Sequence, residues 1–107
     1  MRFDALEVAL QIAQELKGPL IKIRQHDREL ANQAQRAANG VVLQIAEPSK
    51  RAGRDRVYRY RIAVGSTHEL DTGLRLAICW GYLDDADLAP VRALIDRVRA
   101  MLWRLQR

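Results

Sequence analysis

Three residues whose types could support catalysis, Ser66, His68 and Asp71, lie within one short stretch of the chain. A nucleophile, a base and an orienting carboxylate form a hydrolytic triad only when they meet in one line of hydrogen bonds. The stretch has helical periodicity, and on a helix the positions i, i+2 and i+5 point in different directions. The spacing therefore argues against a triad, and we expect no catalytic residues and no enzymatic activity.

The residue types that commonly bind metals are few. The chain contains two histidines, His26 and His68, and one cysteine, Cys79. Neither histidine has a second histidine or a cysteine at a spacing that would place both on one metal ion. We expect no metal site and no cofactor, and a single cysteine excludes an intrachain disulfide.

The densest group of charges lies in residues 50–61, where six cations stand against one anion, Asp55. Tyr58 and Tyr60 alternate with the cations, and an aromatic ring offers a face on which a nucleic-acid base can stack. The segment predicts either the solvated start of a helix or a surface for RNA or DNA, and cations are disfavoured at a helix N-terminus by the helix dipole. The candidate nucleic-acid-binding residues are Lys50, Arg51, Arg54, Arg56, Tyr58, Arg59 and Arg61.

The overall charge is also basic. Eighteen Lys and Arg against thirteen Asp and Glu give a net charge of +5, and fifteen of the eighteen cations are Arg. The planar guanidinium suits bidentate contacts with phosphate or carboxylate. Two partner classes therefore remain open, a nucleic acid and an acidic protein docked on a scaffold, and a GC-rich genome that favours Arg codons is the neutral explanation.

Apolar residues recur with a period of about 3.6 in four segments, and no sustained strand alternation or hairpin turn appears. A chain of 107 residues is a common size for one domain, so we expect a single domain over residues 1–107. Short links between four amphipathic helices predict an all-α, up-down-up-down four-helix bundle. The segments run from about Asp4 to Arg24, from Asp27 to Glu47, from Arg54 to Trp80, and from Ala86 or later toward the C-terminus.

Two prolines bear on these helices. Gly18-Pro19 interrupts the first segment, and it predicts either a kink or a break there because proline removes a helical N–H. Pro90 is best accommodated in a first turn, which predicts that the fourth helix begins at Ala86 or later.

The first and third segments carry more apolar residues than one buried stripe needs. In the first segment, Leu6, Ala9, Leu10, Ala13, Leu16 and Leu20 form the expected stripe, and Val8, Ile12 and Ile23 widen it. An uncovered apolar patch of this size is unusual on a soluble monomer, so we expect a homo-oligomer. The excess apolar residues of the two segments include Val8, Ile12, Ile62, Ile78, Trp80 and Tyr82.

Glu69 stands within the third segment beside positions that should be packed. A buried carboxylate needs a cationic or hydrogen-bonding partner. Arg36 in the second segment is the candidate partner for a structural ion pair, and simple solvent exposure of Glu69 is the alternative.

Targeting signals are absent from the sequence. The N-terminus runs directly into a charged amphipathic pattern, and no stretch approaches 18 uncharged apolar residues. We therefore expect a cytoplasmic protein that does not span or bind a membrane.

An ordered set of short motifs lies along nearly the whole chain: Phe3 with Leu6-Glu7-Val8, Gln33 with Arg36-Ala37-Ala38, Ile45-Ala46-Glu47, Ile62-Ala63, Gly65-Ser66, Glu69-Leu70, Thr72, Leu74 and Gly81-Tyr82. This set resembles the bacterial 23S rRNA-intervening-sequence proteins. The resemblance implies a four-helix bundle and a ring-shaped homo-oligomer, a pentamer; being encoded within an rRNA gene does not itself show rRNA binding. The resemblance extends, more distantly, to the accessory variability determinant proteins of retroelements, which bind nucleic acid and a reverse transcriptase. At Arg56 and Arg59 the family tends to carry aromatic residues.

Overall fold

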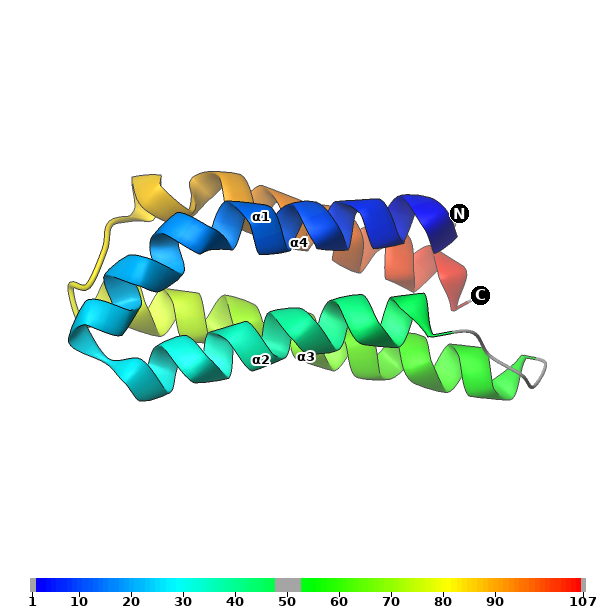
Figure 1. Ribbon diagram of the computed structural model, residues 1–107. Helices are drawn as coiled ribbons and strands as arrows, with labels where there is room; N and C mark the ends of the chain where they lie inside the picture. The colour runs from blue at the N-terminus through cyan, green and yellow to red at the C-terminus, as the bar shows by residue number, and fades with distance from the viewer. Residues whose placement is uncertain (1, 48–52, 107) are drawn as a thin grey trace.

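The computed structural model describes residues 2–47 and 53–106, with side chains from residue 4 onward. Helices account for nearly all of this part of the chain, and it contains no strand, which confirms the predicted all-α fold. Figure 1 shows an up-down-up-down four-helix bundle in which both chain termini lie at the end where α3 begins. The helices are α1 (Arg2–His26), α2 (Arg28–Ala46), α3 (Arg54–Cys79) and α4 (Asp85–Leu105).

Each helix packs against the two neighbours beside it, in the order α1–α2–α3–α4 and back to α1. The buried apolar side chains form one cluster that receives residues from all four helices. Close packing is what gives such a core its stability, because buried side chains exchange water for dispersion contacts with many neighbours. The largest side chains that are almost completely buried include Ile12, Leu16, Ile23, Ile45, Leu70, Leu74, Leu88, Ile95 and Leu102.

The buried stripe of α1 differs from the one expected from the sequence. Val8, Ile12 and Ile23 are buried in the core, whereas Leu10 and Ala13 of the expected stripe are exposed. Apolar residues cover more than half of the circumference of α1, so periodicity alone could not select which part faces the other helices. Val8 and Ile12 therefore belong to the bundle's own core, and the expectation that they form surplus surface is wrong.

Pro19 lies inside a continuous helix. The structure contains no break at Gly18-Pro19, and α1 extends from Arg2 to His26. Figure 1 shows α1 changing direction in its second half, which leads toward α2. A proline at this position removes the N–H that would bind the carbonyl of Glu15 and crowds the preceding turn, which is a common cause of such bends.

The ends of the helices use local capping. Asp27 caps α2, with the backbone N–H of Leu30 donating to its Oδ1 at 3.0 Å. At the end of α3, Gly81 has φ +79° and the N–H of Tyr82 donates to the carbonyl of Ala77 at 3.0 Å, a Schellman arrangement. Glycine suits this position because it adopts positive φ without steric cost.

The start of α4 lies one residue earlier than the sequence predicts, at Asp85. Pro90 is therefore in the second turn, where the missing N–H leaves the carbonyl of Ala86 without its usual partner. Ala86 and Pro90 are both exposed, so water can bind this carbonyl. The Asp87 carboxylate accepts from the N–H of Asp84 at 3.0 Å and from Lys22 of α1 at 3.2 Å.

Within the described residues, no helix has both the length and the apolar composition that crossing a membrane requires.

Replacing Ile23 by Ala should lower the free energy of unfolding by about 2–5 kcal/mol, because the lost side chain leaves a cavity in the core. Ile21→Ala, two residues away, is the matched control: Ile21 is 61% exposed and Ile23 is fully buried. We expect Ile21→Ala to change stability by less than about 0.5 kcal/mol. Urea unfolding followed by circular dichroism measures both variants, and equal losses would contradict the buried face assigned to α1.

Asp87→Ala should destabilise the protein near neutral pH but not in strong acid. The hydrogen bond from the Asp84 backbone and the contact with Lys22 hold the pKa of the Asp87 carboxyl below its ordinary value. A lowered folded pKa stabilises the fold above the unfolded value of about 3.9, and this contribution is lost as the pH falls through the folded pKa. The melting temperatures of parent and variant should therefore differ at about pH 6 and converge at about pH 2. Asp85→Ala is the control, and a difference that persists in acid would refute the role of the ionised Asp87.

Candidate functional site

The first turns of α3 carry the part of the predicted basic segment that the structure describes; Lys50 and Arg51 lie outside the described residues. Arg54, Arg56 and Arg61 are exposed, and Tyr58 is 63% exposed. None of the three arginines forms an ion pair with a described residue. We refer to Arg54, Arg56, Tyr58 and Arg61 as the basic patch.

Arg59 has a different role from the rest of the segment. Its guanidinium contacts Glu47 at 2.9 Å and Gln44 at 3.3 Å on α2, and Asp55 at 3.3 Å one turn earlier on α3. These contacts join the end of α2 to the start of α3 and offset the charge of Arg59. Its Nε and Nη1 groups thus donate within the protein, and its role as a nucleic-acid contact stays a prediction.

Tyr60 is also removed from the surface. It is buried in the core, so it cannot offer a ring face to a base. Only Tyr58 of the two alternating tyrosines remains accessible.

The start of α3 is electropositive for a second reason. Its N-cap residue is Gly53, which has no side chain that could accept a hydrogen bond from the first turn. Asp55 is the one acidic residue of that turn, and it is engaged by Arg59. The partial positive charge of the helix N-terminus therefore adds to the charges of Arg54 and Arg56, an arrangement that is locally unfavourable.

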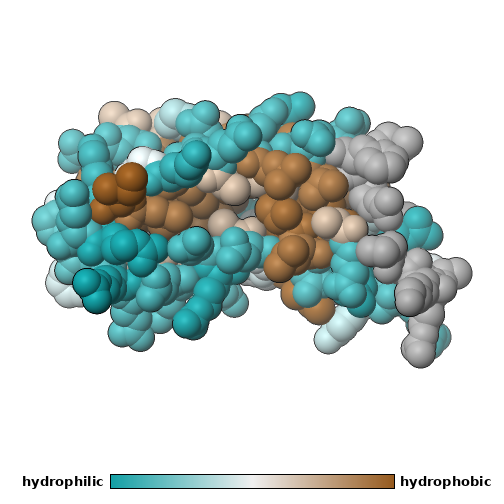
Figure 2. Space-filling view, in the orientation of Figure 1, coloured by the Kyte–Doolittle hydropathy of each residue, from teal (hydrophilic) through white to brown (hydrophobic). Residues whose placement is uncertain are grey.

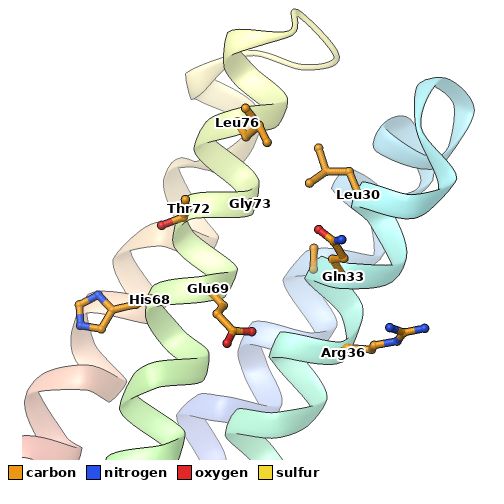
Figure 3. Close-up of a pocket in the computed structure, with 9 residues that line it drawn as sticks. Leu30, Gln33, Arg36, His68, Glu69, Thr72, Gly73 and Leu76 are labelled. Atoms are coloured by element: carbon orange, nitrogen blue, oxygen red, sulfur yellow. The ribbon is translucent and has the colours of Figure 1, made fainter.

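Arg36 and Glu69 lie on opposite sides of a groove between α2 and α3, of about 600 Å³. Figure 3 shows the Glu69 carboxylate directed toward α2 and the Arg36 side chain directed away from α3. The two residues are exposed, and no ion pair joins them in the described part of the chain. Glu69 thus has the solvent exposure that was the alternative to a structural ion pair. The groove also contains Leu30, Gln33, Ala34, His68, Thr72, Gly73 and Leu76.

The three residues with catalytic side chains point to different sides of α3. The Ser66 hydroxyl lies so close to Gly40 of α2 that an added Cβ there would be 2.8 Å from it. Asp71 accepts from Nε of Arg92 on α4 at 3.0 Å, a contact that raises the pKa of Arg92, and His68 is exposed. This geometry is incompatible with a triad, as the spacing predicts. In the described ranges, no three His, Cys, Asp or Glu residues gather closely enough to hold a metal ion.

A second groove, of about 480 Å³, runs between α3 and α4 and includes Val64, His68 and Trp103. At its base Arg99 donates from Nε to the buried hydroxyl of Thr67 at 3.2 Å. Trp103 is 61% exposed. The sequence did not identify Trp103 as a candidate because it lies about 40 positions from Val64, and only the pairing of α3 with α4 brings the two into one groove.

The four packed helices define the protein as a small four-helix bundle. A family model described as 23S rRNA-intervening sequence protein matches residues 3–104. The chain therefore belongs to this family, which confirms the resemblance found in the sequence. Searches of curated proteins and of solved structures find no significant match.

Proposed function

We propose that this protein is a non-enzymatic bundle that binds RNA or DNA through the basic patch. The observation that carries the proposal is the placement of three exposed arginines, Arg54, Arg56 and Arg61, with no ion pair to a described residue. The neighbouring Arg59, by contrast, has three partners within 3.3 Å, so its charge is already compensated inside the protein.

Repulsion between these cations and the positive end of α3 supports an anionic partner. A polyanion that approaches the start of α3 relieves this repulsion and releases its own condensed counterions. Contacts of this kind are made to phosphates and do not read the sequence of the bases. The proposed binding is therefore strongly salt-dependent and has little sequence preference.

An acidic protein docked on the same cations is the second candidate function. The groove between α2 and α3 favours it, because an apolar floor at Leu30 and Ala34 beside the polar Gln33 and Glu69 suits a protein surface. Tyr58 favours the nucleic acid, since its exposed ring lies among the arginines of the basic patch.

Replacing Arg54, Arg56 and Arg61 together by Gln should weaken binding to RNA and DNA alike. Each lost phosphate contact removes about 0.7 from the log–log salt slope on single strands and about 0.9 on duplex DNA. The triple variant should therefore flatten the slope by about 2 to 3 units, which fluorescence anisotropy titrations between about 50 and 200 mM salt would measure.

The matched control replaces Arg28, Arg36 and Arg75 by Gln, which changes the net charge equally but uses exposed arginines outside the basic patch. We expect this control to retain the parent slope. Equal losses of affinity in both triple variants would show that binding follows overall charge and not the basic patch. If the parent binds neither RNA nor DNA at low salt, the acidic protein becomes the favoured partner.

We also propose that the protein is a homo-oligomer, a pentamer as the family resemblance implies. Apolar side chains gather between α1 and α2 on the face seen in Figure 2. The exposed or half-buried apolar residues of these two helices include Leu6, Leu10, Val42 and Leu43. A second copy that covers this α1–α2 face would remove it from water, which is the usual reason for such a surface.

Light scattering coupled to gel filtration should give about five times the chain mass of 12.2 kDa. Leu43→Glu should lower the mass without loss of helical content, because a charge in an apolar interface opposes association. Leu76→Glu on α3 is the control and should retain the parent mass. A monomeric parent would contradict this proposal. Loss of assembly in both variants would show that the interface is not confined to α1 and α2.

A further inference from the structure

We infer that the basic patch prefers single-stranded over duplex nucleic acid, because exposed aromatic rings from two different helices flank Arg61. The inference rests on the proposed function and names the class of nucleic acid that the site takes. The two rings are those of Tyr58 on α3 and Trp103 on α4.

Arg54, Tyr58 and Arg61 lie on one face of α3. Their spacing of four and then three residues places successive side chains one turn apart, with the tyrosine between the two cations. The distance along the axis from Arg54 to Arg61 is about 10 Å. A strand that follows this face meets a cation, a ring and a cation in turn.

Trp103 extends this surface onto α4. It shares the α3–α4 groove with Val64, which is one turn beyond Arg61 on α3. The antiparallel register is fixed by two contacts, Arg92 with Asp71 at 3.0 Å and Arg99 with Thr67 at 3.2 Å. Trp103 follows Arg99 by one turn, so it lies opposite the turn of α3 that contains Arg61.

An exposed ring beside a cation suits an unpaired base. In a duplex the faces of the bases are covered by their neighbours in the stack, so only the phosphates are available to this surface. In a single strand, a base can stack on an aromatic ring while the phosphates beside it contact Arg54 and Arg61. Each ring should therefore strengthen single-strand binding by about tenfold and leave duplex binding almost unchanged.

Fluorescence anisotropy should compare an unstructured 20-nucleotide RNA with the same RNA annealed to its complement, at one salt concentration. The parent should bind the single strand at least tenfold more tightly than the duplex. Tyr58→Ala combined with Trp103→Ala should remove most of this preference and change duplex affinity by less than twofold. The salt slope should stay the same, because no cation is lost.

Trp80→Ala is the matched control, since Trp80 is 65% exposed but lies at the opposite end of α3 from the basic patch. It should retain the parent preference, and Trp103→Phe should retain most of it because a ring remains. In a Trp80→Phe protein Trp103 is the sole tryptophan, and its fluorescence should fall on adding the single strand but not the duplex.

The outcomes separate the two proposals. No binding to either RNA at low salt would overturn the proposed function and this inference together. Binding that is equal for single strand and duplex, or that the double aromatic variant weakens equally for both, would overturn the inference and leave phosphate binding by the basic patch intact.

Discussion

Each helix of this bundle can bury only one face, and the rest of the structure depends on that constraint. The four buried faces meet in one core, which leaves every helix with an outward face that packing does not specify. Residues on the outward faces are selected by solubility and by partners, so these faces are where function has to be sought. On α3 the outward face carries the basic patch, and on α1 and α2 it carries apolar residues.

The arginines of α3 show how the fold separates structural from available charge. Arg59 points toward α2 and has Glu47 and Gln44 as partners, so its charge contributes to the corner between the two helices. Exposed ion pairs of this type contribute only about 0.2–1 kcal/mol each, but they fix the direction of the side chain. Arg54 is five residues before Arg59 and Arg61 is two residues after it on the same helix, and both are exposed to solvent. A difference of position on the helix is therefore enough to give neighbouring cations different roles.

Helical periodicity and the short links between segments were sufficient to predict the four helices and their arrangement. The reason is that each amphipathic helix has to bury its apolar stripe against neighbouring helices. The same periodicity failed on α1, where apolar residues cover so much of the helix that the pattern assigned Leu10 to the core and left Val8 and Ile12 outside it. The start of α4 was predicted one residue too late, because the exposed carbonyl of Ala86 can bind water in place of the N–H that Pro90 lacks. Trp103 could not be connected with Val64 and His68 at all, since the groove they share depends on the register of α4 along α3. The sequence thus predicts which residues are charged or apolar, whereas tertiary contacts decide which of them share a surface.

Both chain termini lie at the end of the bundle where α3 begins (Figure 1). Any segment attached to either terminus, including a purification tag, would therefore emerge at the same end of the bundle as the first turn of α3, which contains Arg54 and Arg56. An acidic extension there would act as a tethered competitor for the arginines, at the high local concentration that a short linker imposes. A basic extension would add to the positive field and increase affinity for any polyanion. The position of the ends thus brings the charge of whatever is fused to this chain to the end of the bundle where α3 begins.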